Sequence, residues 1–218
     1  MNTVVTKEDV EAFAQSCVLL RSMWCHYHTL FEVSKLRREL LAAVAPTFFS
    51  DVCAMLREHL VLHICRLTDN EQTMGRKNLT VKWLMAHADF SAEPAKVERL
   101  RHLSDSINDF RKTILPARNR FISHVDLEAV RAGQPLGGAS QEQWQQFWLV
   151  LQDFLQIIHQ RYVDASGYFY LNGIAMLTDT DALVGALVNS ERFRTVISDG
   201  EVATRALRIS DACKFAGA

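Results

Sequence analysis

No stretch of the sequence stays apolar for the roughly 20 residues that a membrane-spanning helix requires. The opening residues, MNTVVTKEDVEAF, lack a basic region followed by an apolar one, so we expect no secretory signal. Neither sign of charge dominates, because 24 lysines and arginines oppose 25 aspartates and glutamates, for a formal net charge of −1. A net charge this small produces a weak electrostatic field, which does not by itself predict a nucleic-acid partner. We expect a cytoplasmic protein that does not bind a membrane.

Sequence motifs for several kinds of enzyme are also missing. The chain has no Walker loop and no GxGxxG turn, which argues against chemistry driven by ATP or NAD. No GxSxG turn surrounds Ser123, so we do not expect this serine to act as a nucleophile. The cysteines are odd in number, scattered and set in apolar helical patterns, which indicates reduced, mostly buried thiols at Cys17, Cys25, Cys53, Cys65 and Cys213.

What the sequence does contain is helical periodicity, with apolar residues recurring every three or four positions. Capping boxes at Thr6–Asp9 and Ser140–Gln143 each precede such a face. Two further helices should begin near Pro46 and Pro94, because proline is favoured in the first turn. The Pro46 helix is apolar on nearly every side, which is typical of a central, enclosed helix. We therefore predict an all-α bundle of four to five long helices over residues 1–165.

The remaining segments are shorter. Asp69–Lys77 is predicted to be a loop, and a short helix follows it in NLTVKWLMAHA. Residues 166–218 are predicted to form a mostly helical C-terminal extension that packs on the bundle. Its main helix is expected in DTDALVGALVNSERF, and a weak last helix is expected to begin near Ser198.

The stretch PARNRFISHVDLE, residues 116–128, gathers groups that could act on a phosphodiester. The guanidinium of Arg118 could hold a phosphate oxygen and stabilise its developing charge. The imidazole of His124, whose unperturbed pKa is ~6.5, could transfer protons near neutral pH. Asp126 could orient an imidazole or simply begin the next turn. Arginine, asparagine and histidine are also common on exposed helix faces, so a purely solvent-exposed role is the alternative.

Regular helical geometry does not bring these groups together. Arg118 and His124 are six residues apart, so on a straight helix they point ~120° away from each other. One solution is an irregular helix after Pro116, because this proline cannot donate to the carbonyl of Lys112. The other solution is a pair of chains whose motifs face each other and complete a shared site.

At this point the sequence resembles a known family. RNRFISHVDLE is similar to the Arg-(Asn/Asp)…His signature of the HEPN superfamily, and its form looks most like the AbiU-type abortive-infection branch. ICRLTDNEQTMGRKNLTVKWLM resembles a second segment of that branch, an arginine-leucine-x-aspartate helix end followed by an asparagine-leucine-threonine helix start. The resemblance covers about residues 5–165, which would then form a HEPN-like bundle.

The resemblance implies a metal-independent endoribonuclease in a toxin–antitoxin or phage-defence setting, without metal or cofactor. Its site would comprise Arg118, Asn119 and His124, with Arg120 and Asp126 as supporting residues. It also implies a homodimer whose motifs meet across the interface, an RNA substrate and a cognate antitoxin protein as a further partner. The alternative within the same family is a non-catalytic module that binds RNA or a partner.

Two other groups of residues have competing interpretations. His59 and His63 share one helix face. They could bind a metal if Cys25–His28 supply further ligands, or they could form a hydrogen-bonded pair at a helix interface. The second group consists of basic residues, in KLRRELL and at Arg57, Arg66, Arg76 and Lys77. They could form a solvated helix surface, or an edge that binds along the phosphate backbone of a nucleic acid.

Overall fold

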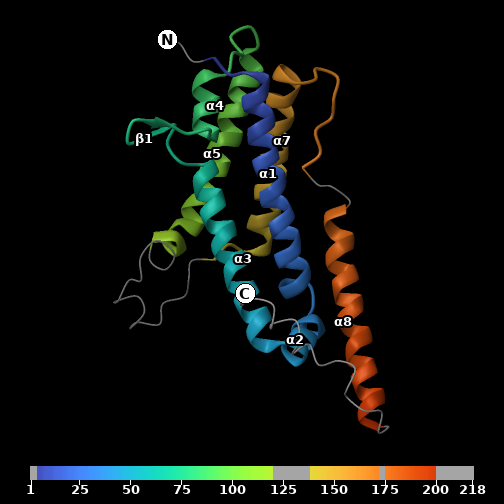
Figure 1. Ribbon diagram of the computed structural model, residues 1–218. Helices are drawn as coiled ribbons and strands as arrows, with labels where there is room; N and C mark the ends of the chain where they lie inside the picture. Colours follow the sequence, from blue (N-terminus) through green and yellow to red (C-terminus); the bar gives the residue numbers. More distant parts are fainter. Residues whose placement is uncertain (1–3, 120–137, 172–174, 200–218) are drawn as a thin grey trace, which may run out of the picture.

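The computed structural model describes residues 4–119, 138–171 and 175–199, and these residues are helical almost throughout (Figure 1). The prediction of an all-α fold is confirmed. In chain order the elements are α1 (Lys7–Tyr27), the π-helical turn η1 (His28–Glu32), α2 (Lys35–Val44), α3 (Pro46–Leu67), β1 (Gln72–Thr73), β2 (Arg76–Lys77), α4 (Val81–His87), α5 (Pro94–Ala117), α7 (Gln141–Tyr162) and α8 (Ala175–Asp199).

Helix starts lie where the sequence signals place them. Thr6 caps α1 by accepting from the Asp9 N–H at 3.2 Å, and the Asp9 carboxylate accepts in return from the Thr6 N–H at 2.9 Å. Ser140 and Gln143 form the same reciprocal pair at the start of α7. Such caps satisfy backbone donors that have no partner within the helix.

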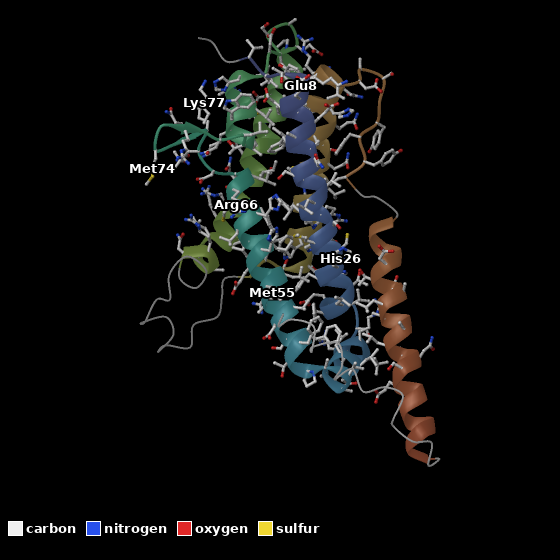
Figure 2. The ribbon with its side chains drawn as sticks, viewed as in Figure 1. Glu8, His26, Met55, Arg66, Met74 and Lys77 are labelled. Atoms are coloured by element: carbon white, nitrogen blue, oxygen red, sulfur yellow. The ribbon has the colours of Figure 1, made fainter. Side chains whose placement is uncertain are left out.

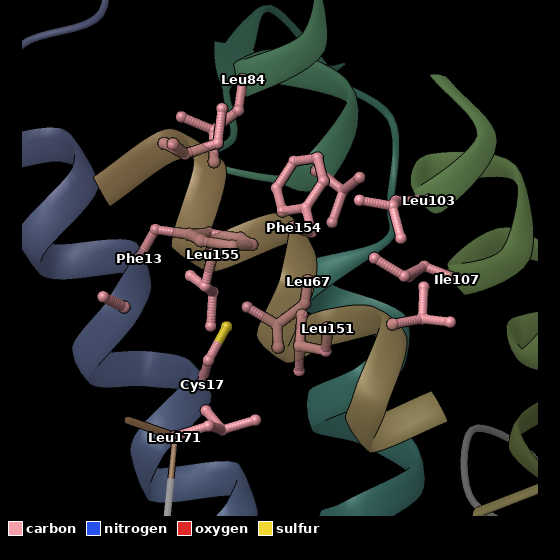
Figure 3. Packing of buried hydrophobic residues seen from close by; sticks show 14 of the residues in the cluster. Phe13, Cys17, Leu67, Leu84, Leu103, Ile107, Leu151, Phe154, Leu155 and Leu171 are labelled. Carbon is pink, nitrogen blue, oxygen red and sulfur yellow. The ribbon is translucent and has the colours of Figure 1, made fainter. Parts of the chain in front are cut away.

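The core is enclosed by α1, α3, α5 and α7, which lie side by side, with α4 covering one end (Figure 1). Phe13 of α1 meets Phe154 of α7 edge to face, with ring centroids 6.4 Å apart. Leu103 and Ile107 of α5 close the same cluster, as Figure 3 shows. Burying each large apolar side chain contributes about 1.5–3 kcal/mol, so this shared interior holds the bundle together.

Helix α3 is enclosed only in its second half, so the prediction of a helix buried on all sides is wrong. Leu60 and Ile64 are buried, whereas Phe48 is 61% exposed and Met55 is 59% exposed (Figure 2). The physical reason is that the first half of α3 packs on one side only, where Phe49 joins Leu41 of α2, while Phe48 and Met55 face solvent. Apolar composition alone does not distinguish the two halves.

The first long helix ends earlier than its apolar pattern indicates. The N–H of Val33 donates at 3.1 Å to the carbonyl of His28, five residues back, which widens this turn into the π-helical η1. Leu30 and Phe31 are thereby turned toward Leu41 and Phe49, in a second small apolar cluster beside α2. A periodicity that continues through Phe31 gave no sign of this change.

Residues 69–77, predicted as a loop, contain a short antiparallel hairpin. Gln72 pairs with Lys77 and Thr73 with Arg76. Met74 and Gly75 form its tip with positive φ angles of 50° and 78°, as a two-residue turn of the I′ kind requires (Figure 2).

Helix α8 lies beside the end of α1, η1 and α2 (Figure 1). The Asp181 carboxylate pairs with Arg37 at 3.0 Å, and the hydroxyl of Thr180 lies 2.6 Å from Nδ1 of His26. Val184 and Leu187 pack against the second apolar cluster. Within residues 4–119, 138–171 and 175–199, every helix is too short or too polar to span a bilayer.

Candidate functional site

The predicted site lies at the C-terminal end of α5 and is described only in part. Arg118 and Asn119 belong to the described residues. Arg120, His124 and Asp126 lie outside them. The part of the site that the structure describes is therefore Arg118, Asn119 and the groups around them.

The helix is irregular at this point, as the missing donor of Pro116 led us to expect. Pro116 lies in the last turn of α5, and Arg118 and Asn119 continue in a π-helical turn. The N–H of Arg118 is directed at the carbonyls of both Ile114 and Leu115. A π-helical turn holds more residues than an α-helical turn, so the directions calculated for a straight helix do not apply beyond Ala117.

The guanidinium of Arg118 is half-buried and is oriented by its neighbour. Nη1 of Arg118 donates to Oδ1 of Asn119 at 3.1 Å. Within the described part of the chain, its Nε is buried and has no hydrogen-bond partner. A buried, unsatisfied donor on an arginine is costly unless something pairs with it, and an anion such as a phosphate oxygen is the natural acceptor.

A second arginine, Arg111, which sequence reasoning missed, lies in α5 seven residues before the first. Nη2 of Arg111 is 3.5 Å from the Asp69 carboxylate, beyond the C-terminal end of α3. Burial raises the pKa of the Cys65 thiol, although the positive charges of Arg111 and Arg118 both act on this thiol to lower it. Both guanidiniums therefore lie near the Cys65 thiol, and the Asp69 carboxylate pairs with that of Arg111.

The sequence did carry a signal for this cluster. Arg111 and Arg118 are seven residues apart, two turns of a regular helix, a spacing that predicts side chains on one side, and in the structure both charges act on Cys65. Asp69 belongs to the RLTD sequence that ends α3, the start of the second segment with family resemblance. The contact between Arg111 and Asp69 therefore joins the second resembling segment to the helix that precedes the motif.

The histidines of α3 form a hydrogen-bonded pair. Nδ1 of His63 lies 3.4 Å from Nε2 of His59, and Nε2 of His63 lies 2.8 Å from the Ser16 hydroxyl of α1. Burial, with the neighbouring charges of His59 and Arg66, lowers the pKa of His63 to about 4. His28 stacks on Trp24, with centroids 4.6 Å apart, rather than joining this pair. No group of three or more metal-binding side chains occurs in the part of the chain described.

Two of the candidate basic residues have local structural partners. Arg37 donates to the carbonyl of Thr29 and Arg38 to that of Phe31, both at 3.0 Å. They satisfy carbonyls at the end of the first helix, where backbone acceptors lack intrahelical donors. Arg57 and Arg66 are exposed on α3, and Arg76 and Lys77 lie on the hairpin.

Comparison with known proteins agrees with the sequence resemblance. No curated protein and no solved structure matches the chain. The HEPN_AbiU2 family model, described as AbiU2, matches residues 6–171. The matched region runs from the cap of α1 through α7, includes the motif at the end of α5, and stops before α8. The chain therefore belongs to the AbiU2 family of HEPN proteins.

Proposed function

We propose that this protein is a metal-independent endoribonuclease of the cytoplasm, acting as a homodimer in a phage-defence or toxin–antitoxin setting. The observation that carries the proposal is the Arg118 side chain. Its guanidinium is half-buried near Cys65, oriented by Asn119, and carries a buried Nε without a partner among the described residues. An anionic substrate group would supply the acceptor that this nitrogen lacks.

The chemistry needs only an arginine and a histidine. His124 removes the proton from an RNA 2′-hydroxyl, and the 2′-oxygen attacks the adjacent phosphorus. The bond from phosphorus to the 5′-oxygen then breaks. The 5′-oxygen leaves and takes up a proton, and a 2′,3′-cyclic phosphate remains on the other product. Arg118 holds the non-bridging oxygens, on which negative charge accumulates. Asn119 keeps the guanidinium oriented, with Arg120 and Asp126 as supporting residues.

A second candidate is a module of the same family that binds RNA or a protein partner, such as an antitoxin, without cleavage. The net charge of −1 favours it, because a near-neutral protein attracts a polyanion only through local groups. The same bundle and the same arginine would then serve recognition alone.

Cleavage of total RNA in EDTA separates the two candidates. We expect the wild type to cut RNA under chelation, and Arg118→Ala and His124→Ala to lower the rate by about 10²-fold or more. Asn119→Ala should lower it by less, and Asn119→Asp should restore it, because aspartate still accepts from Arg118.

Lys112→Ala is the matched control. Lys112 lies on the same helix, is largely exposed and pairs only locally with Asp109, at 2.7 Å. Its removal should leave cleavage unchanged. Measurable RNA binding without cleavage by the wild type would favour the second candidate. Neither RNA binding nor cleavage would contradict the ribonuclease and leave only the form of the second candidate that binds a protein partner.

A further inference from the structure

A cavity of about 520 Å³ opens where η1 and the end of α1 meet α3, α5 and the start of α7. Its wall includes the side chains of Trp24, His28 and Trp144 together with the charged groups of Glu32, Arg57 and Glu58. Cavities that bind small molecules commonly measure about 300–1,000 Å³, with an apolar wall and a few polar groups. This cavity has the size and composition for a flat heterocycle.

One wall is aromatic and rigid. Trp24 stacks on His28 with centroids 4.6 Å apart and rings 15° from parallel. Trp144 of α7 adjoins Trp24 at 6.2 Å, so the wall joins two helices of the bundle. Burial lowers the pKa of His28, although the Glu32 carboxylate opposes this, so burial favours the neutral form of the imidazole. A neutral ring beside tryptophans offers a surface for stacking.

The polar groups combine acceptors with one cationic donor. The Tyr27 hydroxyl donates to Oε1 of Glu32 at 2.6 Å, which fixes that carboxylate on the π-helical turn. Burial, with the hydrogen bond to Glu32, raises the pKa of Tyr27, so the phenol remains a donor. Glu58 and Arg57 reach the cavity from α3. Two carboxylates disfavour an anion inside the cavity and favour a ligand edge that carries N–H groups.

We propose that this cavity binds an unstacked guanine base. Guanine presents two adjacent N–H donors, at N1 and N2, which one carboxylate can accept together. It also presents O6 and N7 acceptors, which suit the fork of a guanidinium. Thymine and uracil present a single N–H between two carbonyls, and carboxylates repel those carbonyls. Stacking on aromatic side chains and hydrogen bonds to a base edge are how proteins read single-stranded RNA.

The cavity adjoins the proposed site. Ala117, immediately before Arg118, lines the cavity together with Ile114. A base held here would therefore belong to a nucleotide close to the phosphate that Arg118 binds. For a base within RNA the inference rests on the proposed ribonuclease activity, whereas a free guanine nucleotide could enter regardless of it.

Calorimetric titration of the full-length His124→Ala protein tests the proposal. The probes are 2′-deoxy trinucleotides with a central guanine or a central thymine, which lack the hydroxyl required for cleavage, and guanosine 5′-monophosphate. We expect the guanine trinucleotide to bind at least about tenfold more tightly than the thymine one, the ratio produced by a charged hydrogen bond. Binding of the mononucleotide as tight as that of the trinucleotide would identify a free nucleotide as ligand, and weaker binding would identify an RNA base.

Added in the same background, Glu32→Gln should remove the guanine preference, and Val61→Trp, which adds a large ring to the cavity wall, should abolish binding of both trinucleotides. Glu39→Gln on the exposed face of α2 is the control and should change nothing. Equal binding of both trinucleotides, or variants that bind like the parent, would overturn the proposal. Guanine preference without RNA cleavage by the wild type would reject the ribonuclease and keep the cavity. RNA cleavage without guanine preference would support the ribonuclease and reject the guanine site.

Discussion

At the scale of single residues, the arginines of α5 differ in how their charge is used. Arg99 and Arg101 form exposed pairs with Asp153 and Glu98, both at 2.6 Å, and such pairs contribute little to stability. Arg111 and Arg118 lie partly buried around Cys65, where a charge is costly to leave unpaired. This cost agrees with the anion binding that we propose for Arg118.

His63 should make the stability of the fold depend on pH. Its pKa is about 4 in the folded chain, and that of an exposed imidazole is ~6.5. Between these values the unfolded chain binds a proton that the folded chain does not. Stability should therefore fall as the pH drops from ~6.5 to ~4, by about 3 kcal/mol, and this contribution should not change further below that.

Chemical denaturation of wild type and His63→Gln across this pH range measures the effect. The glutamine can still bond to Ser16 but does not titrate, so the variant should lose this part of the pH dependence. His102→Gln, on the exposed face of α5, should keep the wild-type slope. If stability changes with pH in the same way in wild type and His63→Gln, the buried imidazole does not control the pH dependence.

At the scale of elements, the cap of α7 is expected to contribute measurably to stability. Ser140 accepts from the Gln143 N–H at 3.2 Å, and the Gln143 side chain accepts from the Ser140 N–H at 2.7 Å. Ser140→Ala should lower the free energy of unfolding by about 1 kcal/mol, because one backbone donor loses its partner. Urea denaturation at constant pH is the measurement.

Ser106→Ala is the matched control for the cap. Ser106 is exposed on α5, and its hydroxyl only bonds back to the His102 carbonyl within the same helix. Its replacement should have little effect, since alanine is the better helix former. Equal losses in both variants would mean that serine removal in general, rather than the cap, weakens the fold.

At the scale of the whole molecule, we expect two chains to share the proposed site. Mixing inactive Arg118→Ala and His124→Ala proteins under subunit exchange should then restore about a quarter of wild-type cleavage, because half of the dimers are mixed and each has one intact site of two. Light scattering should show a dimer throughout. A monomer, or no recovery despite proven exchange, would contradict the shared site.

The sequence by itself determined the helices and much of their packing. Thr6, Ser140 and the two helix-opening prolines signal starts through hydrogen bonds and φ angles that involve only neighbouring residues. The inner faces of α5 and α7 follow a 3.6-residue period, which is also local. Pro116 likewise signalled an irregular helix after itself, because its missing donor is a property of the residue.

Only the tertiary structure decided which residues surround the motif. The half-exposed α3, the turn at η1 and the contact between Arg111 and Asp69 depend on which helices meet, over distances that local periodicity does not encode. The cavity is the clearest case, since Trp24, Glu58 and Trp144 come from three helices far apart in the sequence. Each of these residues has an ordinary local reason to be present, and only their packing places them around one space.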